Sequence, residues 1–126
     1  MSVSTPSDVV HGFLAAWNAN DLDRVVASLH EEVVYHNVPL PAIQGRALVD
    51  SYLRSKGRFD WVDWKLLALA ASGTTVLTER IDEFSVGGRR VSLPVMGSFQ
   101  VVDERIKVWR DYFDLAMYRK QLQSES

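Results

Sequence analysis

The hydrophobic pattern of this 126-residue chain changes its period near the middle. From residue 61 onward, apolar side chains recur at every second position over four long segments, residues 61–71, 74–86, 89–101 and 105–118. Because side chains alternate between the two faces of a strand, this period predicts four β-strands. The third segment alternates most regularly, and one of its faces consists of Val91, Leu93, Val95, Gly97, Phe99 and Val101.

Short turn sequences separate the four predicted strands. They are Ser72-Gly73, Gly87-Gly88 and Asp103-Glu104, of which the double glycine is the strongest hairpin signal. The third turn has no glycine, although two-residue turns favour one. Tight turns between long strands predict an antiparallel meander.

The first part of the chain has a helical period instead. Thr5 is suited to cap a helix that begins at Pro6, with Asp8 as an acidic residue in its first turn. An apolar stripe at helical spacing follows, made of Val9, Val10, Phe13, Leu14 and Trp17. A first helix is therefore predicted, and residues 18–21 are expected to end it.

Two further helices and a short strand are expected before residue 61. The strand covers residues 32–37, and the two prolines in residues 38–41 make that segment a loop or an edge. A third helix is expected after Gly45, with Gly57 as its stop. The expected inward residues are Val25, Val26 and Leu29 in the second helix and Leu48, Tyr52 and Leu53 in the third.

Helices followed by an antiparallel meander predict a single α+β domain over residues 1–126, with a polar tail at about 119–126. We expect the N-terminal helices to pack in the concave face of a strongly curved, mixed and mostly antiparallel sheet. Such an arrangement can leave a pocket between helices and sheet.

The composition excludes several classes of function. A net charge of -2 gives no footprint for nucleic acid or for an anionic membrane. The absence of cysteine excludes disulfides, thiolate nucleophiles and zinc–cysteine sites. The start of the chain has no apolar signal core, and no apolar run is long enough to cross a bilayer, so we expect a cytoplasmic protein.

Charged residues lie on strand faces that should be buried. Arg80 and Asp82 share a face with Val76, Thr78 and Phe84, and Asp111 shares one with Trp109, Phe113 and Leu115. An ionised carboxylate among apolar side chains is costly unless it is paired, and arginine is a natural bidentate partner. This pattern indicates a functional site.

Two carboxylates around one guanidinium suit acid–base chemistry. Burial and like-charge repulsion separate their pKa values, so that one can stay protonated while the other stays ionised. Such a pair can provide a general acid and a general base in one site. Tyr35 and Asn37 point to the same side of their strand and can hold a water molecule between them.

A structural interpretation stands beside this one. An Arg-x-Asp pair on a strand is commonly a structural ion pair, and a β-bulge would turn Asp111 outward. The three histidines, His11, His30 and His36, have no metal-ligand spacing, and we expect His11 and His30 on the surface. No nucleophile elbow and no phosphate-binding glycine loop is present.

Three segments carry a resemblance to a known family. Residues 35–41 (YHNVPLP), 78–82 (TERID) and 109–115 (WRDYFDL) resemble the limonene-1,2-epoxide hydrolase family in order and spacing. The resemblance covers nearly the whole chain, and it implies the curved-sheet cone of the nuclear transport factor 2-like superfamily. It departs at residues 103–105, where a glycine would be expected.

The resemblance implies a one-step hydrolysis of an epoxide to a vicinal diol. Asp111 would be the general base, Tyr35 and Asn37 would hold the water, Asp82 would be the general acid and Arg80 would bridge both carboxylates. No cofactor and no metal would be needed. The expected pocket wall, which would hold a cyclic or terpene-like epoxide, is Leu14, Trp17, Leu53, Phe84, Leu93, Val95 and Phe113.

The resemblance also implies a homodimer packed through the open face of the sheet, with Leu77, Ile81, Trp64 and Ile106 as candidates for that face. Two other functions stay open. One is a ketosteroid isomerase or polyketide cyclase on the same fold, and the other is a non-catalytic ligand-binding or dimerisation module.

Overall fold

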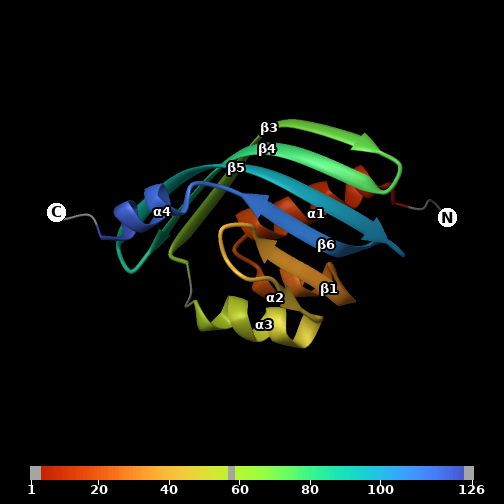
Figure 1. Ribbon diagram of the computed structural model, residues 1–126, viewed down its shortest axis with the longest axis horizontal. Helices are drawn as coiled ribbons and strands as arrows, with labels where there is room; N and C mark the ends of the chain where they lie inside the picture. The colour runs from red at the N-terminus through yellow and green to blue at the C-terminus, as the bar shows by residue number, and fades with distance from the viewer. Residues whose placement is uncertain (1–3, 57–58, 124–126) are drawn as a thin grey trace.

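An open six-stranded sheet curves around the helices in the computed structural model, which describes residues 4–56 and 59–123 (Figure 1). The strand order is β2-β1-β6-β5-β4-β3. β1 and β6 pair in parallel, and all other neighbours pair antiparallel. The elements are α1 (Pro6–Asn18), α2 (Leu22–Ala27), β1 (Leu29–Asn37), β2 (Ile43–Gln44), α3 (Arg46–Ser55), β3 (Trp61–Ser72), β4 (Thr75–Val86), β5 (Arg89–Val102), β6 (Arg105–Tyr112) and α4 (Leu115–Leu122).

The first helix begins where the sequence predicts. The backbone N–H of Asp8 donates to Thr5 Oγ1 and that of Thr5 donates to Asp8 Oδ2, both at 3.1 Å, with Pro6 in the first turn. This capping box satisfies two backbone donors that a helix start otherwise leaves open. The inner face of α1 then packs on the sheet, where the Phe13 ring lies edge-on to Trp109 at 4.9 Å.

The four-stranded meander agrees with its predicted limits to within a residue for β3, β4 and β5. Gly87 and Gly88 both have positive φ angles, 57° and 78°, as a tight hairpin requires. Asp103 and Glu104 take the same left-handed conformation, with φ of 54° and 58°. The last turn therefore forms without glycine. The predicted α+β class, with helices in the concave face of a mixed sheet, is confirmed.

The end of the last strand was predicted wrongly. β6 stops at Tyr112, and residues that were expected to continue the strand and form a polar tail make helix α4 instead. Asp114 caps this helix, because its Oδ1 accepts the backbone N–H of Met117 at 3.1 Å. The apolar alternation of β6 continues into residues 113–118, so the sequence pattern did not indicate a helix cap at Asp114.

A glutamine side chain connects α4 to the sheet by hydrogen bonds. Gln121 Oε1 accepts the backbone N–H of Ser92 at 2.7 Å, and its Nε2 donates to the Ser92 carbonyl at 2.9 Å. Ser92 lies on the part of β5 that has no pairing with β6, because that pairing begins at Met96. The amide thus completes the hydrogen bonding of a strand edge and fixes α4 beside it.

The structure differs from the predictions at three smaller points in the N-terminal part. β1 begins at Leu29 instead of residue 32, because it extends to pair with β6. β2 was not predicted. Leu48 is 63% exposed, and Val49 takes its expected place in the core. The predicted stop at Gly57 lies outside the described residues.

The outer face of the sheet carries only half of its predicted apolar residues. Leu77 is exposed and Ile81 half-buried on this face, whereas Trp64 and Ile106 are buried in the core. Trp64 pairs with Asp82, which faces inward. A register shift beside Val101 turns Ile106 inward, which alternation counted from Trp109 would not predict. In the described part of the chain, no helix is long and apolar enough to span a membrane.

Candidate active site

The predicted carboxylate–arginine cluster forms at the centre of the sheet. Arg80 Nε and Nη2 donate to the two carboxylate oxygens of Asp82 at 2.9 and 2.8 Å. Arg80 Nη2 also donates to Asp111 Oδ1 at 3.2 Å, and Nη1 donates to Thr78 Oγ1 at 3.0 Å. Arg80 is 1% exposed and both aspartates are 5% exposed. One buried guanidinium therefore joins two buried carboxylates.

Strand register brings these residues together, and Gly97 makes room for them. Gly97 of β5 stands directly between Thr78 of β4 and Asp111 of β6. A Cβ at position 97 would overlap Arg80 Nη1, and it would lie 2.7 Å from Thr78 Oγ1 and 3.1 Å from Asp111 Oδ1. The missing side chain is thus the space that the guanidinium occupies.

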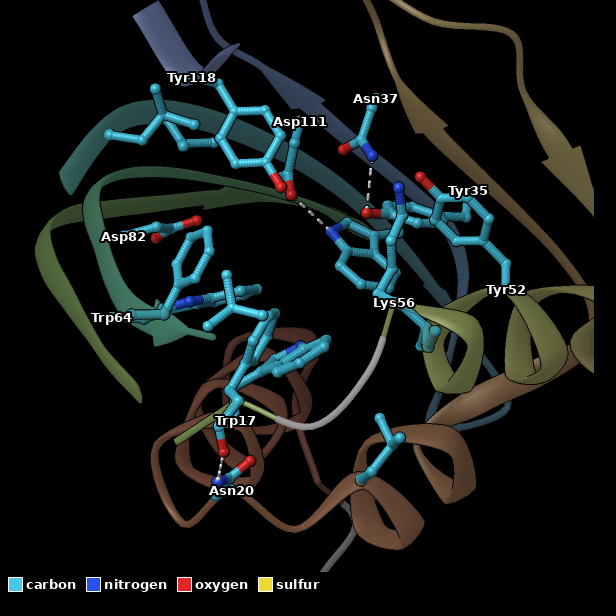
Figure 2. Close-up of a pocket in the computed structure, with 18 of the residues that line it drawn as sticks. Trp17, Asn20, Tyr35, Asn37, Tyr52, Lys56, Trp64, Asp82, Asp111 and Tyr118 are labelled. Atoms are coloured by element: carbon cyan, nitrogen blue, oxygen red, sulfur yellow. Dashed lines mark hydrogen bonds between the residues drawn. The ribbon is translucent and has the colours of Figure 1, made fainter. Parts of the chain in front are cut away.

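The parallel pairing of β1 with β6 adds the next group. It places Tyr35 opposite Trp109 and Asn37 opposite Asp111. Asn37 Nδ2 donates to Tyr35 Oη at 2.8 Å, and Trp109 Nε1 donates to Asp111 Oδ2 at 3.0 Å (Figure 2). The Tyr35 ring stacks on the Trp109 indole at 3.9 Å. This contact holds the Tyr35–Asn37 pair close to the Asp111 carboxylate.

Burial determines the electrostatics of the site. Loss of solvent raises the pKa of Asp82 to about 6, against the opposing hydrogen bonds and charge of Arg80 and with a smaller contribution from the charge of Asp111. Burial also raises the pKa of Tyr35 well above its ordinary value, so its phenol stays neutral and can donate a hydrogen bond. Arg80 keeps its charge at any ordinary pH.

A cavity of about 990 Å³ opens onto the two carboxylates. Asp82, Asp111, Tyr35 and Asn37 all line it, as predicted, and Arg80 lies behind them. The predicted wall residues that line it are Trp17, Leu53, Phe84, Leu93, Val95 and Phe113. These six lining side chains are all apolar or aromatic.

Leu14 is the one predicted wall residue that the cavity does not include. It is 5% exposed and belongs to the hydrophobic core. Trp17, one turn further along the same helix, stacks on Trp64 at 4.7 Å and forms the wall there. Helical spacing identified the buried stripe of α1 but could not tell which of its members reaches the cavity.

Several residues of the site were not predicted as part of it. They are Thr78, Gly97 and Trp109 around the carboxylates, and Tyr52, Lys56, Tyr118 and Leu122 along the cavity. Gly97 carried a signal, since a glycine within a regular strand often marks a close approach. The sequence contained little signal that α4 contributes to the cavity, because residues 113–123 were predicted to be strand and polar tail.

The structure gives no separate role to the histidines. His11 is exposed, and His30 Nδ1 accepts the backbone N–H of Glu32 at 3.0 Å. Within residues 4–56 and 59–123, no three His, Cys, Asp or Glu side chains are grouped so that they could hold a metal ion. The groups that this arrangement brings together are two buried carboxylates, one guanidinium and the Tyr35–Asn37 pair.

A buried Asp–Arg–Asp cluster lies in the concave face of a curved sheet, and comparisons with known proteins identify the class of protein. The model of the limonene-1,2-epoxide hydrolase catalytic domain matches residues 4–123. The chain is 41% identical over 107 residues to the epoxide hydrolase EphG of Mycobacterium tuberculosis. The matched region covers 84% of this chain and 71% of the relative. The chain therefore belongs to the limonene-1,2-epoxide hydrolase family and is an enzyme of the epoxide hydrolase class.

Solved structures share the fold. An LEH-like epoxide hydrolase of M. tuberculosis superposes with a TM-score of 0.82 and 39% identity, over 94% of this chain and 89% of the other. A putative polyketide cyclase of Xanthomonas campestris matches with a TM-score of 0.78 and 24% identity, over 93% and 96% of the two chains. At that identity, the second likeness concerns the fold alone. The predicted family and fold class are confirmed.

Proposed function

We propose that this protein hydrolyses a hydrophobic, cyclic or terpene-like epoxide to a vicinal diol in one step, without a cofactor or a covalent intermediate. The observation that carries the proposal is the pair Asp82 and Asp111, which share the Arg80 guanidinium at 2.8 and 3.2 Å and line one largely apolar cavity. Ring strain makes an epoxide a ready electrophile, so a positioned water and a proton donor suffice.

In the proposed reaction, Tyr35 and Asn37 hold the attacking water beside Asp111. Asp111 takes a proton from this water as the water oxygen bonds to a ring carbon. The bond between that carbon and the epoxide oxygen breaks, and Asp82 gives its proton to the oxygen. The diol then carries both oxygens, and a proton passes from Asp111 back to Asp82 through solvent to restore the enzyme.

The local environments support this assignment of roles. The raised pKa of Asp82, about 6, lets its carboxyl keep a proton closer to neutral pH than an ordinary aspartate does. Each Asp111 oxygen accepts one N–H, from Arg80 or from Trp109, which holds the proposed base at a fixed angle. Arg80 offsets the charge that moves between the two acids during the reaction.

The two other interpretations fit the site less well. An isomerase on this fold would need donors aimed at an oxyanion, and the Arg80 guanidinium, which could supply them, is buried against Asp82, Asp111 and Thr78. In a non-catalytic module, the ion pairs of Arg80 with Asp82 and Asp111 would serve stability alone. It would give no role to the Tyr35–Asn37 pair beside Asp111.

The proposal is tested with a panel of cyclic, terpene and linear epoxides. We expect diol formation well above the uncatalysed rate for at least one class, and incorporation of one ¹⁸O atom from labelled water into the diol in a single turnover. Label that first enters the protein would indicate a covalent intermediate. A folded protein that forms no diol from any member would overturn the proposal.

The acid role of Asp82 predicts how activity depends on pH. Because its pKa lies at about 6, kcat/KM should fall above that pH as the carboxyl loses its proton, with only about a tenth still protonated at pH 7. The measurement is a pH profile of kcat/KM from pH 4.5 to 9. Glu83→Gln is the matched control, because Glu83 faces outward and pairs with Lys65. A profile that rises through pH 6 and stays flat would contradict the assignment.

We also propose a homodimer that packs through the outer face of the sheet. Leu77, Met96 and Tyr112 stand on this face and are 46%, 50% and 48% exposed, and Met96 and Tyr112 are direct cross-strand neighbours there. Light scattering should give twice the 14.3 kDa mass of the chain, and Leu77→Glu should shift it toward the monomer. A wild-type monomer at micromolar concentration would refute this assembly.

A further inference from the structure

A second group of polar side chains lines the same cavity as the carboxylates. Tyr52 and Lys56 come from the end of α3, and Tyr118 comes from α4. Figure 2 shows Tyr52 and Lys56 reaching the cavity on one side and Tyr118 entering it from another. The proposed hydrolysis uses none of them, although their ammonium and phenol groups are hydrogen-bond donors.

Lys56 is held in place by an aromatic ring. Its Nζ lies 4.7 Å from the centroid of the Tyr52 ring, at cation–π distance. Its side chain is thus laid along the ring beside the cavity. No carboxylate among the described residues pairs with it, whereas its neighbour Arg54 pairs with Asp23 at 2.8 Å.

The other charged side chains of the cavity are already engaged. Asp82 and Asp111 bind Arg80, and Asp21 Oδ1 accepts the backbone N–H of Arg24 at the start of α2. Among the lining residues that the structure describes, Lys56 is therefore the charged group left to bind a ligand.

Tyr118 lies within electrostatic reach of the same group. Burial raises the pKa of the Tyr118 phenol, the charge of Lys56 lowers it and Tyr52 raises it again. Its ring packs edge-on to Phe113 at 6.2 Å, which fixes its direction. In the described part of the chain, neither the Tyr52 nor the Tyr118 hydroxyl has a hydrogen-bond partner, so both can donate to a ligand.

We propose that Tyr52, Lys56 and Tyr118 form a subsite for a carboxylate on the epoxide substrate. The inference rests on the proposed hydrolysis, since it assigns the epoxide to the Asp82–Asp111 end of the cavity. One ammonium and two phenol donors match a monoanion, and charge-assisted hydrogen bonds are the stronger kind. The apolar side chains that line the cavity then hold the carbon skeleton, and the substrate class is an epoxy acid.

The volume of the cavity agrees with this substrate class. About 990 Å³ lies at the upper end of the range for small-molecule sites and exceeds what a ten-carbon epoxide alone needs. A phosphate dianion fits less well, because four aspartates line the same cavity and, of its two described lining cations, Arg54 already pairs with Asp23. The structure thus favours one negative charge on the ligand.

The test compares an epoxy acid with its methyl ester on the same carbon skeleton. For the wild type, we expect a higher kcat/KM for the acid and a smaller difference at high salt. Lys56→Met keeps the length of the side chain and removes its charge, so the acid-to-ester ratio of kcat/KM should fall about fivefold, mainly through KM. Tyr52→Phe and Tyr118→Phe should each lower the ratio about threefold.

Lys65→Met is the matched control. Lys65 lies on the outer face of β3, paired with Glu83 at 3.0 Å, and its loss should leave the acid-to-ester ratio unchanged. A ratio that is the same in the wild type and in Lys56→Met would overturn the subsite while leaving epoxide hydrolysis intact. A wild type that preferred the ester to the acid would overturn the subsite as well.

A binding measurement makes the test independent of turnover. Calorimetry with the diol acid, which cannot react further, should give weaker binding to Lys56→Met than to the wild type, with no such difference for the diol ester. Equal affinities for the diol acid would refute the subsite. Hydrolysis of neither epoxide by a protein that binds the diol acid through Lys56 would refute the reaction and keep the subsite.

Discussion

Asp111→Asn is expected to lower epoxide hydrolysis by about 10²- to 10⁴-fold while the protein stays folded. An amide cannot take the proton from the attacking water, although its shape is that of the carboxylate. The amide has only one acceptor oxygen, so either Arg80 or Trp109 loses its present partner on this side chain. The unfolding temperature should therefore drop modestly while activity is nearly lost, as measured by diol formation and by thermal unfolding monitored with circular dichroism.

Asp103→Asn is the control for this substitution. Asp103 is an exposed turn residue at φ 54°, a conformation that asparagine tolerates well, and it lies outside the cavity. Its kcat and unfolding temperature should match those of the wild type. Turnover by Asp111→Asn at the wild-type rate would show that Asp111 is not the base. It would favour the interpretation that the cluster is a structural ion-pair network.

Gly97→Ala should damage both stability and activity, because the added methyl group enters the space of the Arg80 guanidinium. Overlap with Arg80 Nη1 and the 2.7 Å approach to Thr78 Oγ1 force one of these groups to move. Overpacking of a well-packed interior costs about 1–3 kcal/mol. Displacement of Arg80 also disturbs both carboxylates, so we expect kcat to fall at least about tenfold, which corresponds to ~1.4 kcal/mol.

Gly12→Ala provides the comparison. Gly12 lies on the exposed side of α1, and nothing stands within 4 Å of a Cβ built there. Because alanine is the better helix former, that variant should be as stable as the wild type or more so. Denaturant unfolding and steady-state kinetics on both variants separate the two effects. Equal stability and kcat for Gly97→Ala and the wild type would show that the sheet can yield around Arg80.

The sequence was sufficient to predict which charged residues cluster because its signals are local. Arg80, Asp82 and Asp111 broke the apolar alternation of their own strands, and the cost of burying charge made their pairing the simplest expectation. Tyr35 and Asn37 needed one further inference, that two residues on one strand face point the same way. The capping box at Thr5 and the double-glycine turn were readable for the same reason.

Errors arose where alternation continued through a change of structure. Phe113 and Leu115 keep the period of β6, but Asp114 caps a helix that begins at Leu115. Ile106 was assigned to the outer face, and a shift in register turns it inward. Both cases show that a period gives the faces of a strand only while the strand is regular. Bulges and caps depend on neighbours that the local pattern does not contain.

The sequence by itself determined the fold class, the four long strands and the identity of the buried charged residues. Only the tertiary structure decided that β1 pairs with β6, which brings Tyr35 and Asn37 to Asp111. It also decided that Gly97 is the gap for Arg80 and that α4 supplies Tyr118 to the cavity. The physical reason is that strand period and burial cost act within a segment. Register and cavity shape arise from contacts between segments far apart in the chain.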